Sequence, residues 1–414
     1  MILLRNIGLV LCLFGSNLLF KLQAQTAPMR FENYTTQNGL PQNSGYSIAQ
    51  TPEGFMWFGT QDGLCRYDGT HLIVYKNEPD DSLSLCANQI NALCTDSKGN
   101  LWIGTPHGIC VYNRFSDHFE LPSAYWHMNT KADHINTASL LQVDDNHLFV
   151  VSGDEGLFLL QKNKQEPVVF FPGPFEKLSL SEIKKNDQNK VCISSGNDLQ
   201  QFNGQSFEPL MLQHFSGVPD KNFEISHFLF AKGLLWLSTT QHGLLKVNLS
   251  TKKVVEKIDI DKKLWHLRKN ELTDLLLDLN DNIWVGTSAD GIYKYNEATG
   301  QLTNGRFNPV DKFSIRKNYI IALFEDKQGI IWIGTSGGGI AKYDPSKFVF
   351  QQVSLIDSKG KPAPDNMVMS LYNSGTNGLV AGTQSGGIIT GDRHFANLQF
   401  FKNKPNDPSS ILSD

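Results

Sequence analysis

The chain has 414 residues, of which 40% are hydrophobic and 19% charged, and it contains 35 glycines and 26 phenylalanines. This composition is that of a globular protein, and the length exceeds one ordinary domain but suits a closed all-β ring with many tight turns. The 37 basic and 41 acidic side chains give a formal net charge of −4 without a basic run, so nucleic acid is excluded as an expected partner.

Residues 1–25 have the pattern of a signal peptide. Arg5 supplies the positive charge, an apolar stretch runs from Ile7 to Phe20, and Ala24 offers a small residue for cleavage. The stretch is short for the ~20 residues of a membrane-spanning helix, so we expect cleavage, with an uncleaved anchor as the alternative. A periplasmic or otherwise extracytoplasmic location follows.

Five cysteines lie beyond this segment, and their number and spacing argue against a metal site. The number is odd and no Cys-x-x-Cys pair occurs, so buried strand thiols are a better interpretation than zinc or a disulfide framework. One disulfide among the first four remains open. These cysteines are Cys65, Cys86, Cys94, Cys110 and Cys192. We expect no metal and no cofactor.

A Trp-x-Gly-Thr segment recurs along the rest of the chain. Clear copies contain Trp57, Trp102, Trp284 and Trp332, and a weaker copy contains Trp236. Degenerate copies occupy residues 148–152, 191–194 and 379–383. The eight anchor positions are 57, 102, 149, 191, 236, 284, 332 and 380, and successive anchors differ by 45, 47, 42, 45, 48, 48 and 48 residues. Such regular spacing is the signature of a repeat protein.

Each repeat predicts four short strands. In the second repeat these are Ile90–Cys94, Leu101–Gly104, Gly108–Tyr112 and Phe119–Leu121, with a turn at Asp96–Gly99 between the first two. Four strands in ~45 residues match one blade of a β-propeller, and the alternating polarity opposes a helical array. We therefore expect an all-β fold, a propeller of four-stranded blades.

The repeat tryptophans and the turn aspartates are predicted to be structural. Strict spacing and apolar neighbours indicate that the tryptophans fill the wedge between blades, with a sugar platform as the alternative. The segment that begins at Asp278 resembles the start of a calcium loop, but Ile283 and Ala289 stand where that loop needs Gly and Glu. A plain turn is therefore predicted there.

The full motif, D-x-x-G-x-[LI]-W-[IV]-G-T-x-x-G-[LI]-x-x-Y, resembles the two-component regulator propeller repeat. Its residues are Asp96, Gly99, Leu101, Trp102, Gly104, Thr105, Gly108 and Tyr112, and again Asp326, Gly329, Trp332, Gly334, Thr335, Gly339 and Tyr343. An earlier copy begins at Pro52 in place of Asp. The resemblance covers residues 30–414. It implies the extracytoplasmic sensor region of a Bacteroidetes-type hybrid histidine kinase, in which two propellers precede an Ig-like domain, a transmembrane helix and a kinase, and which commonly detects oligosaccharides.

The chain departs from that plan, because it has no Ig-like segment and no kinase motif. Residues 405–414 match residues 78–85, which lead into a repeat, so we expect a fragment or a truncated product. The expected domains are a seven-bladed propeller over residues 30–353, closed by Arg30–Tyr34 as an outer strand, and the start of a second propeller over 354–414. Eight blades in one ring is the competing count. A second propeller or Ig-like domain of the parent sensor is an expected partner, and a homodimer is left open.

Ligand binding is expected at the loops that follow each Gly-Thr pair, because these loops and the connections between blades share one face of a propeller. Two tryptophans outside the repeat fall in such connections and could supply aromatic faces for a saccharide or another small polar ligand. The predicted binding residues are Trp126, Trp265, Tyr125, His107, His242, Asp62, Asp290 and Gln384. The alternative is that these are ordinary loop residues and packed loop anchors.

The leading functional prediction is an extracytoplasmic ligand-sensing propeller of a hybrid two-component histidine kinase. The alternatives are a stand-alone secreted binding propeller and a propeller enzyme that acts on polysaccharide. No catalytic motif is present, and an enzyme would depend on carboxylates such as Asp62, Asp290 and Glu271, proposed on placement alone.

Overall fold

A computed structural model describes most of the chain after the predicted signal peptide. The described residues are 29–126, 134–152, 155–172, 180–217, 224–239, 242–258, 260, 272–347, 367–373, 378–392 and 398–412. The signal peptide prediction concerns residues that lie outside them. Helices in the described residues are too short or too polar to cross a bilayer.

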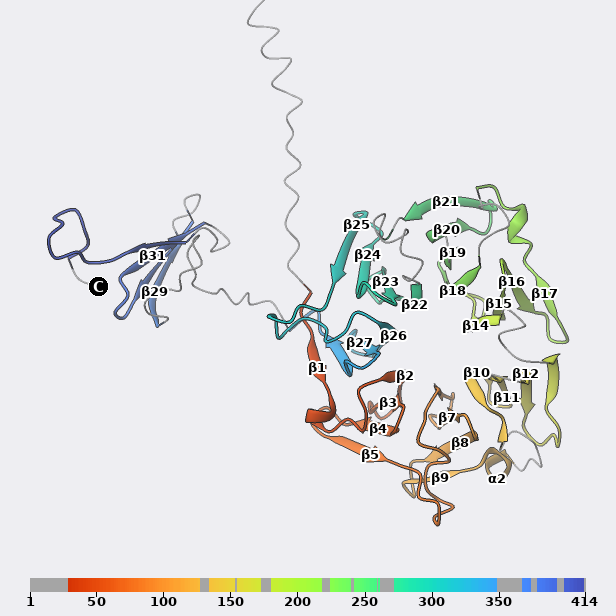
Figure 1. The fold of residues 1–414 in the computed structure, drawn as a ribbon. Coiled ribbons are helices and arrows are strands. Elements are labelled where there is room, and N and C mark those ends of the chain that lie inside the picture. Colours follow the sequence, from red (N-terminus) through yellow and green to blue (C-terminus); the bar gives the residue numbers. More distant parts are fainter. Residues whose placement is uncertain are drawn as a thin grey trace, which may run out of the picture. The chain divides into compact units, whose positions relative to one another are not determined.

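The described residues form eight four-stranded antiparallel sheets (Figure 1). Blade 1 contains β2 (Gly45–Gln50), β3 (Met56–Thr60), β4 (Gly63–Tyr67) and β5 (Leu72–Tyr75). Blade 2 contains β6 (Ala92–Thr95), β7 (Leu101–Thr105), β8 (Gly108–Asn113) and β9 (His118–Glu120). Blade 3 contains β10 (Thr137–Asp144), β11 (His147–Ser152), β12 (Gly156–Gln161) and β13 (Val168–Pro172). The short helices η1 (Thr36–Asn38) and α2 (Pro122–Trp126) lie in connections.

Blades 4 to 7 repeat the arrangement. Blade 4 contains β14 (Leu180–Lys185), β15 (Val191–Ser195), β16 (Asp198–Phe202) and β17 (Phe207–Pro209), and blade 5 contains β18 (Ile225–Ala231), β19 (Leu234–Thr239), β20 (Gly243–Asn248) and β21 (Lys253–Ile258). Blade 6 contains β22 (Leu272–Leu277), β23 (Asn282–Thr287), β24 (Ile292–Asn296) and β25 (Gln301–Gly305). Blade 7 contains β26 (Ile320–Glu325), β27 (Ile331–Thr335) and β28 (Ile340–Tyr343), together with β1 (Glu32–Tyr34). The helix η3 (Leu212–His214) follows β17.

The N-terminal strand closes the ring. Strand β1 pairs antiparallel with β28, so that Asn33 lies opposite Ala341 and Tyr34 opposite Ile340. The first strand of each blade lies nearest the ring centre (Figure 1) and contacts the first strand of the next blade, and β2 contacts β26 to complete the circle. Seven blades therefore form one ring, and the expected propeller fold is confirmed.

The eighth sheet is a separate compact unit. The chain divides between Pro345 and Ser346, and the second unit contains β29 (Val368–Asn373), β30 (Leu379–Thr383), β31 (Ile388–Gly391) and β32 (Gln399–Phe401). Its first strand exposes all six residues. In this sheet Ala381, Ile389 and Leu398 form a small core.

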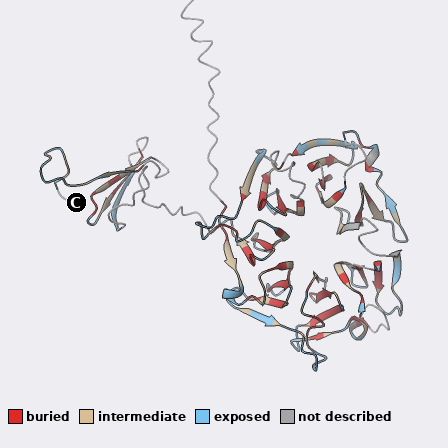
Figure 2. Cartoon of the chain, in the orientation of Figure 1, coloured by how far each residue is buried: buried red, intermediate tan, exposed pale blue. Residues whose placement is uncertain are grey.

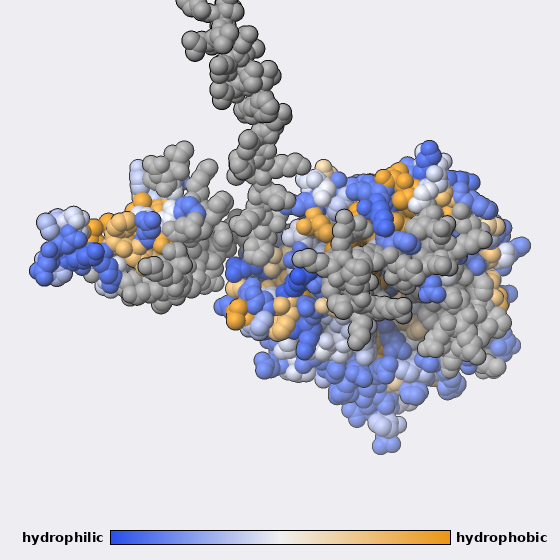
Figure 3. Space-filling view, turned by 45° about the horizontal axis from the view of Figure 1, so that its top comes forward, coloured by the Kyte–Doolittle hydropathy of each residue, from blue (hydrophilic) through white to orange (hydrophobic). Residues whose placement is uncertain are grey.

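The repeat tryptophans are core residues, as predicted. Their exposed fractions lie between 0 and 2%, and buried residues concentrate inside the blades (Figure 2). Four of the five pack against the tyrosine of the following blade, with ring centroids 4.6 to 6.0 Å apart: Trp57 with Tyr112, Trp236 with Tyr295, Trp284 with Tyr343, and Trp332 with Tyr67. The Trp and Tyr of the motif thus join neighbouring blades. The visible outer surface of the ring is mostly hydrophilic, with separate hydrophobic patches (Figure 3).

The glycine of the Gly-Thr pair permits close packing between blades. A Cβ placed on Gly104 would lie 3.0 Å from Cβ of Thr137 on the next inner strand, which is too close for an unstrained contact. Any larger residue would push blade 3 away from blade 2.

The turn aspartates organise the entry to the second strand. Asp278 accepts hydrogen bonds from the backbone N–H of Asn280 (2.9 Å) and Asn282 (2.8 Å) and from the Trp284 indole (2.8 Å). This is the predicted turn, because the carboxylate is used by its own loop. In blade 1 the equivalent residue is Thr51 and not Pro52, since Thr51 N–H bonds Phe55 O (3.0 Å) as Asp278 N–H bonds Asn282 O (3.0 Å).

All five cysteines of the propeller are free thiols, and Cys65, Cys110 and Cys192 are buried. Burial raises the pKa of Cys65 and Cys192 to about 12. Buried strand thiols were the preferred interpretation, and the disulfide that remained open is not formed among these described residues.

Candidate functional site

One end of the ring carries the turns that follow the Gly-Thr pairs, and we call it the loop face. In blade 1 the Gly63 N–H bonds Asn88 O (2.7 Å) and the Ile90 N–H bonds Thr60 O (2.9 Å). The turn between β3 and β4 therefore lies beside the connection to the next blade, as predicted for a shared face.

The threonine of each Gly-Thr pair shapes its loop. Thr287 is fully buried, and its hydroxyl donates to Gly291 O (2.8 Å) and accepts the Asp290 N–H (2.9 Å). Equivalent threonine hydroxyls accept the backbone N–H groups of the other predicted loop residues, namely Asp62 (3.2 Å), His107 (3.1 Å) and His242 (3.0 Å). Four predicted binding residues thus occupy one structural position in four blades.

Their side chains differ in availability. Asp62 forms an ion pair with Lys76 (2.7 Å), and Asp290 is buried against Arg306 (2.5 Å) and the Tyr293 hydroxyl. Both carboxylates are therefore neutralised within their own blades, which weakens the enzyme alternative built on them.

The two predicted histidines differ from each other in exposure. His107 is exposed and His242 half-buried. Burial and then Lys257 lower the pKa of His242, which favours its neutral form at pH 7.

Trp126 is not an exposed aromatic platform in the structure. It ends α2, is 3% exposed and packs edge-on against Trp102, with ring centroids 4.8 Å apart. Blade 3 has Leu160 where other blades have the motif tyrosine, and Leu160, Trp102 and Trp126 share one core. Trp126 therefore takes the place of the missing tyrosine, and the loop-anchor interpretation describes it better.

The remaining predicted residues lie elsewhere in the chain or outside the described residues. Tyr125 lies in α2, Trp265 and Glu271 lie outside the described residues, and Gln384 is exposed in the second unit.

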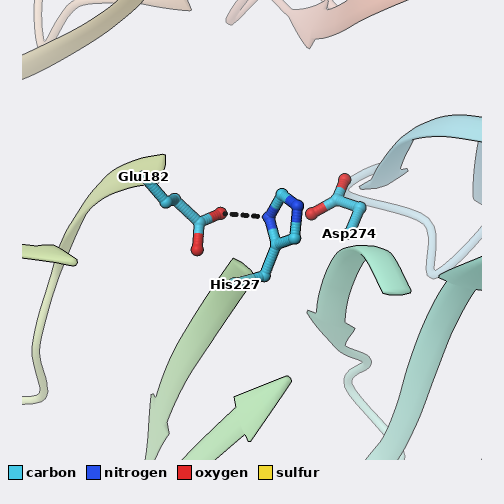
Figure 4. Close-up of side chains that lie close together, drawn as sticks. All are labelled: Glu182, His227 and Asp274. Atoms are coloured by element: carbon cyan, nitrogen blue, oxygen red, sulfur yellow. Dashed lines mark ion pairs between the residues drawn. The ribbon is translucent and has the colours of Figure 1, made fainter. Parts of the chain in front are cut away.

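Three titratable side chains near the centre of the ring were not predicted from the sequence. Glu182, His227 and Asp274 come from the inner strands β14, β18 and β22 and point toward one another (Figure 4). Each lies on its inner strand opposite the glycine position of the Gly-Thr pair on the second strand, near the loop face. Asp274 lies opposite Gly286, and His227 lies opposite Ser238, which replaces that glycine in blade 5. The corresponding residues in other blades include Ser47, Ala92, Ser139 and Ala322. An alignment of this single position would have revealed the cluster.

Lys184 completes the group, which we call the channel cluster (Glu182, Lys184, His227, Asp274). Its ammonium lies 2.5 Å from Glu182 Oε1 and 3.8 Å from Asp274 Oδ1, and it donates to Leu275 O (3.3 Å). The side chain therefore reaches from blade 4 to blade 6. The His227 Nδ1 lies 3.3 Å from Glu182 Oε1.

The pKa values of the two carboxyl groups are shifted in opposite directions. Burial alone would raise the pKa of Glu182, but Lys184 and His227 outweigh it and lower the pKa to about 2. The pKa of Asp274 is raised by burial, which Lys184 and His227 offset only in part. Burial opposes the charge on Lys184, yet the two carboxylates raise its pKa. The cluster thus offers hydrogen-bond donors and acceptors together in a narrow channel.

The cluster resembles a cation site only in its distances. Oxygen and nitrogen atoms of Glu182, His227 and Asp274 lie within 4.8 Å of one another, but the Lys184 ammonium already provides the positive charge between the carboxylates. A metal ion would have to displace it. The arrangement fits recognition of a polar ligand better than metal binding.

Comparison with known proteins supports the repeat assignment. Residues 84–107 and 314–337 match the family model of the two component regulator propeller. A histidine kinase, P4, of Formosa agariphila is 39% identical over 82 residues, which are 20% of this chain and 6% of that protein.

Solved structures support the fold. The extracellular domains of two proteins of B. thetaiotaomicron assigned as hybrid two component systems superpose with TM-scores of 0.66 and 0.60, at 20% and 21% identity. They cover 89% and 92% of this chain, which spans about half (48%) of each of them. The chain is a β-propeller of four-stranded blades in which two segments match the two component regulator propeller model, and its fold resembles that of the extracellular domains of these two proteins.

Proposed function

We propose that this chain is the extracytoplasmic, ligand-sensing propeller of a hybrid two-component histidine kinase, and that a small polar ligand such as an oligosaccharide binds at the channel mouth of the loop face. The observation that carries the ligand site is the channel cluster. Three adjacent blades place charged side chains where other blades have Ser or Ala, although a packed propeller does not need charges there.

The chemistry of the cluster favours a ligand rich in hydroxyl groups. A saccharide hydroxyl can donate to a carboxylate and accept from an ammonium or imidazole at the same time. The loops with His107 and His242 surround the same face. Further extracytoplasmic domains of the sensor, a second propeller or an Ig-like domain, would then respond to ligand binding. A second copy of the chain in a homodimer could respond in the same way.

The test is direct binding of a panel of neutral and acidic oligosaccharides to the purified chain, measured by calorimetry. Glu182→Gln removes the charge but keeps the shape of the side chain, and we expect at least tenfold weaker binding. Asp281→Asn is the matched control, because Asp281 lies in the turn at the opposite end of blade 6, in an exposed ion pair with Lys232 (2.6 Å). Its affinity should equal that of the unmodified chain.

Two results would contradict the proposal. If no member of the panel binds, the chain is not an oligosaccharide sensor. If a ligand binds and Glu182→Gln has the affinity of Asp281→Asn, the site lies elsewhere than the channel mouth. Release of shortened glycans during the measurement would instead support the polysaccharide-acting alternative.

A further inference from the structure

A pocket between blades 1 and 2 lies where blade 1 differs in two respects from blades 6 and 7. It has a volume of about 320 Å³ and lies at the end of the ring opposite the loop face, beside the turns that precede β3 and β7. Its walls are Thr51, Glu53, Phe55, Trp57, Arg66, Gly99, Tyr112, Arg114 and Phe115. Both departures concern residues of this wall.

The first departure concerns the indole N–H of the repeat tryptophan. In blades 2, 6 and 7 this group donates to the turn aspartate six residues earlier, from Trp102 to Asp96 (3.0 Å), from Trp284 to Asp278 (2.8 Å) and from Trp332 to Asp326 (2.8 Å). Blade 1 has Thr51 in that position. The Trp57 indole N–H is fully buried and has no hydrogen-bond partner.

The second departure concerns the cation above the same ring. Lys246, Lys294 and Lys342 place their ammonium groups 5.2 to 5.4 Å from the centroids of Trp236, Trp284 and Trp332. In blade 1 the residue is Arg66, whose guanidinium lies 5.8 Å from the Trp57 ring and 5.1 Å from Phe55.

Arg66 is only partly satisfied by the protein. Its Nη1 donates to the Tyr112 hydroxyl (2.8 Å) and contacts Asp117 (3.5 Å), while its buried Nε–H has no partner. The blade therefore has two buried N–H donors, on Trp57 and Arg66, and lacks the carboxylate that accepts the indole N–H in its counterparts.

We propose that this pocket binds the carboxylate of a small organic acid, which occupies the position that the turn aspartate fills in blades 2, 6 and 7. A buried donor without an acceptor costs about 1–3 kcal/mol, so an incoming acceptor is favoured. A carboxylate has two oxygens, one for the indole N–H and one for the guanidinium, and it strengthens both bonds by its charge.

The walls of the pocket select the rest of the ligand. Phe55 and Tyr112 offer aromatic faces, and Phe115, 89% exposed, stands at the opening. Glu53 does not oppose an anion strongly, because it forms an ion pair with Arg114. An acid with a flat apolar body, such as an aromatic carboxylate, matches this lining.

Nuclear magnetic resonance of the indole N–H groups tests the proposal on the whole chain. The seven tryptophans give seven signals, and Trp57→Phe identifies the one of interest. Titration with benzoate at constant ionic strength should shift the Trp57 signal saturably and leave those of Trp102 and Trp284, whose N–H groups are already bonded. Acetate should bind more weakly, and benzamide, which lacks the charge, should not shift the signal.

Two conservative variants provide the controls. Thr51→Asp supplies the missing carboxylate from the chain itself, and it should fold because Asp occupies this position in blades 2, 6 and 7. It should weaken benzoate binding at least tenfold. Arg66→Lys restores the cation of the other blades and removes the Nε–H, with the same expected loss.

The proposal is overturned if benzoate leaves the Trp57 signal unchanged at concentrations up to about 50 mM, a range in which a weak carboxylate site with a Kd near 1 mM would be saturated. It is also overturned if benzamide shifts the signal as strongly as benzoate, or if Thr51→Asp binds benzoate as well as the unmodified chain does. These outcomes are independent of the oligosaccharide measurements, which concern the opposite end of the ring.

Discussion

Trp332 in the last blade packs against Tyr67 in the first, with ring centroids 5.6 Å apart and the ring planes at 66°. The Tyr67 hydroxyl also lies 2.9 Å from that of Tyr34 on β1, the strand that completes blade 7. The ring is thus closed by the Trp–Tyr contact that also joins three other pairs of neighbouring blades, together with the N-terminal strand β1.

Removal of this closing contact should destabilise the whole propeller. Trp332→Ala deletes a side chain that is 2% exposed and leaves a large cavity, so we expect a loss of about 3–5 kcal/mol in the free energy of unfolding. Urea unfolding followed by fluorescence measures it. Val310→Ala, at a residue 91% exposed, should change stability by less than about 0.5 kcal/mol. An equal effect of the two variants would show that the contact does not hold the ring closed.

Trp126 should matter for stability and not for ligand binding. Trp126→Ala is expected to cost about 3–5 kcal/mol, because it removes a buried ring that packs edge-on against Trp102. Adding Leu160→Tyr, which restores the motif tyrosine of blade 3, should recover part of the loss. No recovery would refute the idea that Trp126 replaces that tyrosine. Any ligand found for the loop face should bind the single variant with unchanged affinity.

The channel cluster should make stability depend on acid. The pKa of Glu182 falls from 4.5 to about 2 on folding, so the folded state binds this proton less tightly than the unfolded state does. The stabilisation is complete above about pH 4.5 and is lost as the pH falls toward 2, by on the order of 3 kcal/mol. Glu182→Gln should lack this component in urea unfolding measured from pH 6 to pH 2.

Asp281→Asn is again the control for this pH series, because its exposed ion pair with Lys232 is far from the cluster and should contribute little. It should lose stability with acid as the unmodified chain does. If Glu182→Gln follows the same curve, Glu182 is not the group whose protonation weakens the fold.

The Gly-Thr threonine should be required for its hydroxyl. Thr287→Val keeps the shape of the side chain but leaves the Asp290 N–H without its bond inside a buried site and removes one of the two hydrogen bonds to Gly291 O, at an expected cost of about 1–3 kcal/mol. Thr287→Ser keeps the hydroxyl and should cost less. The midpoints of urea unfolding decide between them, and equal midpoints for Ser and Val would show that the methyl group matters more than the hydrogen bonds.

The sequence by itself determined the fold. The regular recurrence of Trp-x-Gly-Thr fixed the four-stranded unit, the number of units and the burial of the tryptophans, because each of these depends on local pattern within one repeat. The turn at Asp278 was readable for the same reason, since its hydrogen bonds join residues at most six positions apart. The degenerate units around residues 149 and 191 were found through spacing alone.

Only the tertiary structure decided where the functional candidates lie. Glu182, His227 and Asp274 are 45 and 47 residues apart, and ring geometry brings them together because equivalent positions of successive inner strands face one channel. The role of Trp126 depended on Leu160, and the Trp57–Arg66 pocket on the absence of an aspartate in one blade. In each case the candidate site or the altered packing lies where a blade departs from the repeat pattern. Its properties depend on the side chains of the neighbouring blades, which only the folded ring brings to the same place.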